Sequence, residues 1–201
     1  MLRRALRIRK PVLLPILVGG LLALAAVSPA MAAPPAAQDL NPAPPDFYTC
    51  NPVGGGTICR AHTVDQYERE ATGIFCGAVE ILDSGIRDVQ ATRWYDGDGN
   101  LTRRFRTFLF RDAHLTNPAT GLTLPYSQHN ADTDELAVPG DLGSATLSSS
   151  GHLSITAPGF GGVWMDTGHA IVSPEGDLLA RSGVSLLDAD AVCAALGTPN
   201  G

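Results

Sequence analysis

Residues 92–110, TRWYDGDGNLTRRFRTFLF, constrain the fold of this chain more than any other stretch. An aromatic run closes on Asp96-Gly97-Asp98-Gly99-Asn100, and a second run opens at Leu101. Glycine and asparagine tolerate the positive φ angles of tight turns, and both flanks are rich in residues that favour strands. The stretch therefore predicts a β-hairpin.

Segments of similar composition recur along the chain between turn signals, and no helical segments separate them. Short strands joined by turns are typical of an antiparallel meander. We therefore predict an all-β fold, a meander that closes as a small barrel or forms a sandwich, with one short C-terminal helix. The expected strands are 58–64, 74–82, 86–95, 101–115, 122–130, 145–149, 152–157, 163–172 and 178–184, with turns that include Asp83-Ser84-Gly85 and Ser150-Gly151.

Two segments carry finer predictions. The second half of strand 101–115 is apolar on both sides, which predicts that it is covered twice or bulged. The helix is expected over Asp188–Leu196, because Asp188 suits an N-cap and Gly197 suits a C-terminal stop. Cys193 falls on the apolar stripe of this helix and is expected to face the sheet.

The four cysteines are Cys50, Cys59, Cys76 and Cys193. An even number in an exported chain indicates two disulfides, for which three connectivities exist. Cys50 and Cys59 flank a glycine-rich loop that brings them together easily, which leaves Cys76 for Cys193. A metal site is the alternative, but the chain has no CxxC motif and no cysteine–histidine spacing of a zinc site.

The N-terminus reads as an export signal. Residues 1–10 carry five basic residues and no acid, residues 12–27 are mostly apolar, and Ala30-Met31-Ala32 fits a cleavage site. Residues 1–32 are therefore expected to be a signal peptide, with no stable membrane anchor after cleavage. Residues 33–46 read as a Pro/Ala-rich spacer and residues 47–197 as a single disulfide-bonded domain. We expect a secreted, extracellular protein.

Charge excludes several functions. The chain has 14 basic and 20 acidic residues, and removal of the five basic residues of the signal leaves 9 − 20 = −11. Such a chain repels nucleic acid, so we predict no nucleic-acid partner. Lys10 is the only lysine, so the mature chain has no lysine chemistry. The arginines of the central strand, Arg103, Arg104, Arg106 and Arg111, are expected to divide between two faces and to pair with acids.

Asp166-Thr167-Gly168 is the sharpest catalytic motif. Aspartic proteases use Asp-Thr-Gly because two such loops bring two carboxylates together to share a proton. Only one copy is present, so this activity would require a homodimer across Asp166. The alternative is a strand that ends in a polar bend.

The remaining candidates are weaker. Five histidines form no metal-binding motif, although His152 and His169 could converge in a meander. Asp96, Asp98 and Asn100 alternate as at the start of a calcium loop. Leu101 and Thr107 nevertheless stand where such a loop needs glycine and glutamate. We therefore predict no metal and no cofactor, and name Asp166, His152 and His169 only as candidates if the protein is an enzyme.

Four stretches carry a resemblance to a known group. WYDGDGNLTRR, LTNPATGLTLPY, GVWMDTGHAIVSPEGDLLARSG and VCAALG resemble a group of secreted actinobacterial proteins with similarly spaced hairpins. The resemblance covers roughly residues 72–197 and implies no activity, because none is assigned to that group. It argues against the protease, since the central position of the Asp-x-Gly turn varies there.

The function expected from the sequence is a non-enzymatic extracellular binding module. It would bind a small apolar ligand inside a barrel or present its loops to a partner protein, as a monomer. The alternative is a small β-barrel enzyme of the isomerase or cyclase type, with polar groups in the lumen. His152 and an acid such as Asp166 facing inward together would favour the enzyme.

Overall fold

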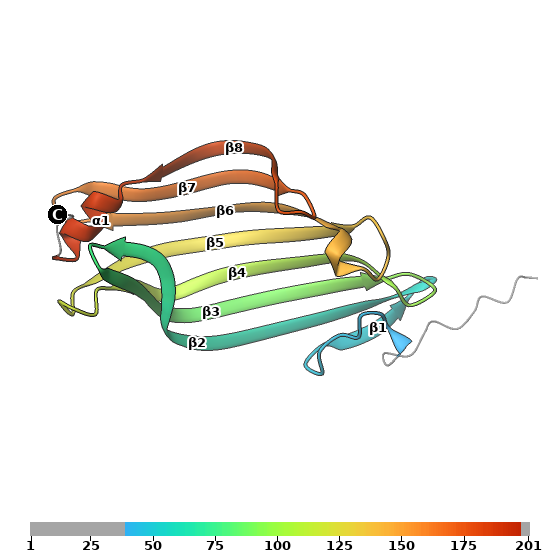
Figure 1. Cartoon of the computed structure of the whole chain (residues 1–201). Helices are drawn as coiled ribbons and strands as arrows, with labels where there is room; N and C mark the ends of the chain where they lie inside the picture. The colour runs from blue at the N-terminus through green and yellow to red at the C-terminus, as the bar shows by residue number, and fades with distance from the viewer. Residues whose placement is uncertain (1–38, 198–201) are drawn as a thin grey trace, which may run out of the picture. The chain divides into compact units, whose positions relative to one another are not determined.

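The computed structural model describes residues 39–197, which form one sheet of eight antiparallel strands and a short helix (Figure 1). Each strand pairs with its neighbours in sequence, in the order β1-β2-β3-β4-β5-β6-β7-β8. The strands are β1 (Thr49–Val53), β2 (Gly56–Cys76), β3 (Val79–Tyr95), β4 (Leu101–Thr116), β5 (Thr123–Leu136), β6 (Ala145–Ala157), β7 (Gly161–Val172) and β8 (Leu178–Leu187). The helix is α1 (Ala189–Ala195), and a 3-10 turn, η2 (Leu142–Ser144), precedes β6.

The predicted all-β meander and its C-terminal helix are confirmed. Within residues 39–197, no pairing joins β8 to β1 or β2, so the sheet remains open and is not a closed barrel. The predicted hairpin is the β3–β4 connection, where the Asp96 carboxylate accepts hydrogen bonds from the backbone N–H groups of Asp98 and Asn100. The predicted signal peptide, residues 1–32, lies outside the described residues.

One predicted turn is wrong. Asp83-Ser84-Gly85 lies inside β3, and the chain turns instead between β2 and β3, where Gly77 has a φ of +64°. Gly85 stands opposite Tyr67, and a Cβ there would lie 2.9 Å from the Tyr67 hydroxyl. Gly85 therefore allows a close side-chain approach and does not turn the chain.

A second predicted turn is also wrong. Ser150 and Gly151 lie in the middle of β6, which runs unbroken past both. A Cβ on Gly151 would lie 2.7 Å from the Cβ of Asn130 and 2.8 Å from the carbonyl oxygen of His129. The glycine is needed because β5 approaches closely, which single-sequence patterns do not reveal.

The end of β2 curls over one face of the sheet toward α1 (Figure 1). The register with β3 shifts between Tyr67 and Glu70 and again between Ala71 and Phe75, and Arg69 has a φ of +58°. Such irregularities bend a strand away from a regular ladder. We call the face covered by this curl and by α1 the inner face of the sheet, and the opposite one the outer face.

Both predicted disulfides are confirmed. Cys50 bonds to Cys59 across the β1–β2 pair, and Cys76, at the end of the curl, bonds to Cys193 in α1. The second bond joins segments 117 residues apart in sequence. Asp188 caps α1 by accepting a hydrogen bond from the backbone N–H of Ala191, as predicted.

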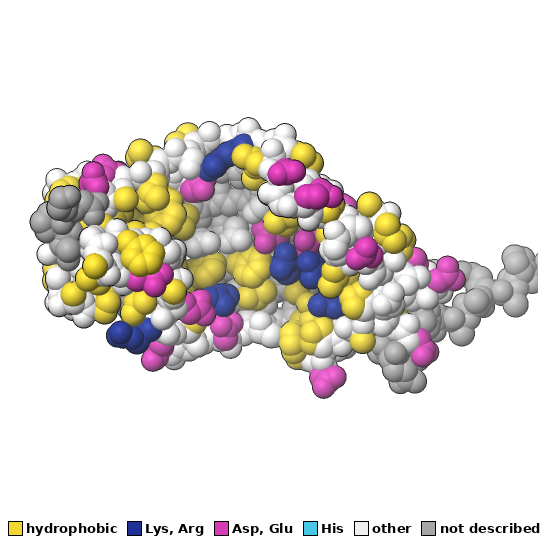
Figure 2. All heavy atoms as spheres, in the orientation of Figure 1, with side chains coloured by type: hydrophobic (Ala, Val, Ile, Leu, Met, Phe, Trp, Pro, Cys, Tyr) yellow, Lys and Arg dark blue, Asp and Glu magenta, His cyan; other side chains and the backbone are white. Residues whose placement is uncertain are grey.

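The core is divided between the two ends of the sheet. The larger cluster lies beneath the curl and α1 and includes Ile81, Leu115, Leu124, Ile155, Val192 and Leu196. The smaller cluster contains Leu40, Cys59, Tyr95 and Leu101. Leu40 is buried, so the folded part begins before the expected boundary at Phe47. Between the clusters the inner face is hollowed and open, as Figure 2 shows.

The prediction for strand 101–115 is confirmed as a bulge. The register of β4 with β5 shifts between Phe110 and His114, and Asp112 has a φ of +51°. A bulge re-aims the residues that follow it. Leu115 is buried in the larger core.

Candidate functional site

The candidate site is a groove on the inner face, with a cavity of about 310 Å³. Its walls carry side chains from four adjacent strands, β5 to β8. They include Gln128, Asn130, Leu153, Trp164, Asp166 and Arg181. These six side chains supply one indole ring, one aliphatic group, two amides and two charges.

A row of glycines crosses the sheet beneath this groove. Asn130 pairs with Gly151, Gly151 with Gly168, and Gly168 with Gly183, so three adjacent strands lack a side chain at this level. Gly183 has a φ of +112°, and a Cβ there would collide with the backbone carbonyl oxygen of Thr167. Glycine is thus required by the close packing of β7 and β8, and the missing side chains leave the groove its depth.

An ion pair lies across this row. Nη2 of Arg181 donates to Oδ1 of Asp166 at 2.7 Å, while the register places Gly168 and Gly183 between the two residues. Both side chains are close to half exposed. The pair therefore offers donor and acceptor atoms to a bound molecule and leaves no net charge in the groove.

A smaller cavity of about 190 Å³ adjoins the groove beneath the curl of β2, and the two share Gln128, Leu153 and Trp164 as lining residues. Leu115 and Ile155 of the larger core line it as well. The acidic side chains of Glu70 and Asp83 also belong to its lining. The two cavities together run from β8 to the curl of β2, and both have a mixed polar and apolar lining.

A cluster of one carboxylate and two tyrosines borders the smaller cavity. The Tyr126 hydroxyl donates to Oδ2 of Asp83 at 2.8 Å, and the Tyr67 hydroxyl donates to Oδ1 at 3.4 Å. The two hydroxyl oxygens lie 3.0 Å apart. Since Tyr67, Asp83 and Tyr126 come from β2, β3 and β5, this cluster ties the curl of β2 to the body of the sheet.

Burial shifts the pKa values of all three groups. It raises the pKa of the Asp83 carboxyl, while the hydrogen bonds from Tyr126 and Tyr67 oppose that rise. Burial also raises the pKa of the Tyr126 hydroxyl, and its bonds to Tyr67 and Asp83 raise it further. The pKa of Tyr67 is raised by burial as well. The tyrosines thus remain hydrogen-bond donors, and Asp83 is the group that titrates first.

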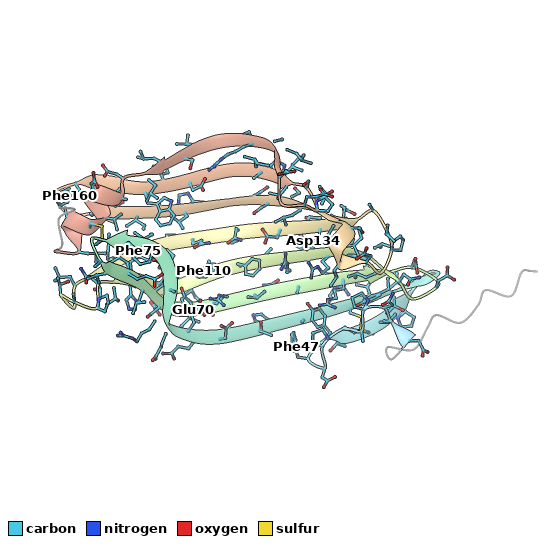
Figure 3. All side chains as sticks on the ribbon, viewed as in Figure 1. Phe47, Glu70, Phe75, Phe110, Asp134 and Phe160 are labelled. Carbon is cyan, nitrogen blue, oxygen red and sulfur yellow. A yellow bond between two sulfur atoms is a disulfide. The ribbon has the colours of Figure 1, made fainter. Side chains whose placement is uncertain are left out.

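Ion pairs form the wall of the inner face farthest from the curl. Asp134, which is 5% exposed, accepts from Nε of Arg104 at 3.1 Å and from Nη2 of Arg106 at 3.2 Å. Asp134 and Phe110 mark this wall and the centre of the inner face in Figure 3. Arg103 instead pairs with Glu135 on the outer face, so the predicted division of the arginines and their pairing with acids are confirmed.

His152 and Asp166 do not face inward together, which is the arrangement that would have favoured an enzyme. His152 stands opposite Thr167 and bonds its hydroxyl at 2.8 Å, which places it on the outer face, whereas Asp166 is on the inner face. His169 also lies on the outer face, where Nδ1 is 2.9 Å from the Ser150 hydroxyl. The two histidines share a face but bond different hydroxyls, and His152 also contacts the Ser154 hydroxyl through Nε2 at 3.2 Å. Both residues border the groove, although their rings lie on the opposite face of the sheet.

Asp166-Thr167-Gly168 occupies the middle of β7 and not a loop. The Asp166 carboxylate is already engaged by Arg181, which is not the environment in which two carboxylates share a proton. Within residues 39–197, no group of three or more histidine, cysteine or acidic side chains could hold a metal ion.

Of the inner-face side chains described above, the sequence pattern indicates only Asp166 as a candidate site residue. Asp83 was assigned to a turn, and Tyr67 and Tyr126 lie 59 residues apart with no local motif between them. Gly151, Gly168 and Gly183 carried one usable signal, namely glycine within strand-like segments, which indicates close backbone approach.

Comparison with known protein families, curated proteins and solved structures finds no match for this chain. The resemblance to secreted actinobacterial proteins therefore stays a prediction. Among residues 39–197, no helix is long and apolar enough to cross a membrane. The two disulfides indicate an oxidising compartment.

Proposed function

We propose that this protein is a secreted, non-enzymatic binding module that takes a small neutral amphiphile in the groove of its inner face. The observation that carries the proposal is the open groove between two separate cores, with about 310 Å³ of space and a mixed lining. Small-molecule sites combine apolar walls with a few polar groups that fix orientation. The groove has this composition.

The lining favours a neutral ligand over a charged one. Asp166 and Arg181 neutralise each other, and Asp132 and Asp134 together balance Arg104 and Arg106. Gln128 and Asn130 add amide donors and acceptors suited to hydroxyl groups. The polar part of the ligand would contact these residues.

The apolar part would lie against Leu153 and Trp164, which the groove and the smaller cavity share. This modifies the expectation of an apolar ligand in a closed barrel, because the sheet is open and the lining is mixed. In the other form of this proposal, a partner protein would insert one of its side chains into the groove in place of a free ligand.

The test uses the two tryptophans as reporters. Trp164 lines the groove, whereas Trp94 stacks with Arg103 on the outer face, with the guanidinium 5.0 Å from the ring centroid. The probe is n-octyl glucoside below its micelle concentration, a neutral molecule with a hydroxylated head and an apolar tail. In Trp94→Phe, the emission of Trp164 should shift and saturate. In Trp164→Phe, the emission of Trp94 should stay constant; a response of Trp94 alone, or of neither residue, contradicts the proposal.

A second candidate function is an enzyme that abstracts a proton, favoured by the hydrogen bonds of Asp83 with Tyr126 and Tyr67. A carboxylate with a raised pKa beside tyrosine donors is an arrangement used in proton transfer next to a carbonyl. Asp83 would accept the α-proton, and Tyr126 would donate to the carbonyl oxygen. Deuterium exchange at the α-carbon of a ketone that binds the smaller cavity tests this: the wild type should accelerate it, and Asp83→Asn should not. Equal exchange in both excludes the activity.

A further inference from the structure

The free edge of the sheet at β8 is suited to pairing with another strand. All ten residues of β8 are exposed, including Leu179 at 62% and Val184 at 56%. The strand order leaves one side of β8 without a neighbour among the described strands (Figure 1). Such an edge presents a row of unpaired backbone donors and acceptors, which only another strand satisfies along its length.

The opposite edge of the sheet is protected, which makes β8 exceptional. β1 pairs with β2 only as far as Arg60. Beyond that point β2 carries Asp65, Glu68 and Glu70, and its register shifts bend it out of plane. Charges and bulges are the usual means of blocking edge pairing. β8 has neither proline nor lysine, and its single charged residue, Arg181, is engaged by Asp166. Its one register shift with β7 lies at its start, between Leu178 and Ala180.

We propose that β8 pairs with β8 of a second copy of this chain, antiparallel and about a twofold axis perpendicular to the sheet. This symmetry keeps the inner faces of both copies on the same side, so residues that stand opposite each other must belong to the same face. A register centred on Gly183 satisfies this condition. It places Gly183 opposite its own copy, and residues 179–187 form the paired segment.

The sequence of β8, LLARSGVSLL, is complementary to itself in this register. Leu179 stands opposite Leu187 of the second copy on the inner face, and Ala180 stands opposite Leu186 on the outer face. Arg181 stands opposite Ser185 and is offset from the second Arg181, so like charges do not meet. Apolar cross-strand pairs stabilise such a ladder, whereas directly opposed like charges destabilise it.

Pairing of β8 with a second copy would also change the groove. Arg181 and Ser182 of β8 line the groove, which therefore reaches the free edge of the sheet. With the inner faces on the same side, the grooves of the two copies would meet across the twofold axis. The second copy would close the side of each groove that is open in a single chain. The dimer replaces the monomer expected from the sequence.

Sedimentation velocity of the full secreted chain tests the proposal. The wild type should change from monomer to dimer with rising concentration, and Val184→Lys should remain a monomer. Val64→Lys is the matched control, because Val64 also lies on the outer face and is 54% exposed, but belongs to β2. It should dimerise as the wild type does.

Two results would overturn the proposal: a wild type that stays monomeric throughout, or a dimer that Val64→Lys weakens as much as Val184→Lys does. Far-ultraviolet circular dichroism of each variant confirms that it is folded. Octyl glucoside titration of the monomeric Val184→Lys variant separates the dimer proposal from the ligand proposal. If the dimer does not form, a single chain should still bind the ligand in its own groove.

Discussion

Asp166 and Arg181 meet across a pair of glycines, with Nη2 of the guanidinium 2.7 Å from Oδ1 of the carboxylate. Gly168 and Gly183 stand opposite each other between them. Any side chain at either position would stand between the two charged groups. The depth of the groove and the ion pair across it therefore depend on the same two glycines.

Gly183→Ala should destabilise the fold. Its Cβ would collide with the carbonyl oxygen of Thr167, and the φ of +112° is unfavourable for alanine. We expect a loss of about 1–3 kcal/mol in the free energy of unfolding, measured by urea titration. Gly162→Ala in β7 is the matched control, because a Cβ there meets nothing within 4 Å. Equal losses in both variants would mean that close packing at Gly183 is not the cause.

Asp134→Ala should destabilise more than Glu135→Ala, although the two residues are adjacent. Asp134 is buried and bonds two partly buried arginines, so its removal takes the paired acid from Arg104 and leaves Arg106 only the longer contact with Asp132, at 3.7 Å, at a cost of about 2–4 kcal/mol. The Glu135 side chain is 60% exposed and its ion pair with Arg103 contributes about 0–1 kcal/mol. Thermal unfolding of both variants measures the difference, and a larger loss for Glu135→Ala would contradict the assignment of faces.

Asp83→Asn should change how stability depends on pH. Burial raises the pKa of Asp83 in the folded state, so its ionisation opposes folding as pH rises from about 3.9, the pKa of unfolded aspartate, through the folded pKa. Relative to Asp83→Asn, the wild type should therefore lose stability across this window. Urea unfolding of both proteins from acid to neutral pH measures this difference.

Tyr126→Phe supplies the companion measurement. It removes a hydrogen bond that favours the Asp83 carboxylate, so the pKa of Asp83 in the folded state should rise further. The pH range over which the protein loses stability should therefore widen. If the wild type instead gains stability over Asp83→Asn with rising pH, the tyrosine hydrogen bonds outweigh burial.

Removal of the Cys76–Cys193 bond should destabilise more than removal of the Cys50–Cys59 bond. In the chain-entropy description a bond that closes a loop of 117 residues contributes about 4–5 kcal/mol, and one that closes 9 residues contributes about 2–3 kcal/mol. Two variants, each with both cysteines of one disulfide replaced by alanine, are compared by urea unfolding to test which bond contributes more. Loss of the longer link also releases the curl of β2 from α1. A reversed order would show that the curl is held mainly by its own packing.

The sequence predicted the features whose causes are local. The hairpin at residues 96–100 and the cap at Asp188 depend on side chains that bond their own neighbouring backbone. The division of Arg103 and Arg104 between faces follows from strand alternation alone. The disulfide pairing was also accessible, because a short loop paired Cys50 with Cys59.

The features with non-local causes were missed. Gly85 and Gly151 resembled turn residues, and only the strand packed beside each one explains why it is glycine. Asp83 and Tyr126 meet across 43 residues, which no spacing in the sequence indicates. Whether the sheet closes depends on pairing between β8 and β1 or β2, strands far apart in the sequence, and residue patterns did not indicate that this pairing is absent among the described residues.

The central claim is that the groove of the inner face binds small molecules, and fragment screening by amide and indole NMR tests it most directly. Ala170 lines the groove on the inner face, whereas Ala131 lies on the outer face. Neutral fragments should shift the indole signal of Trp164 and the amide signals of Gly151 and Gly168, and leave the indole signal of Trp94 unchanged. Ala170→Phe should abolish these shifts and Ala131→Phe should preserve them. Shifts that cluster around Trp94, or that survive Ala170→Phe, would contradict the claim.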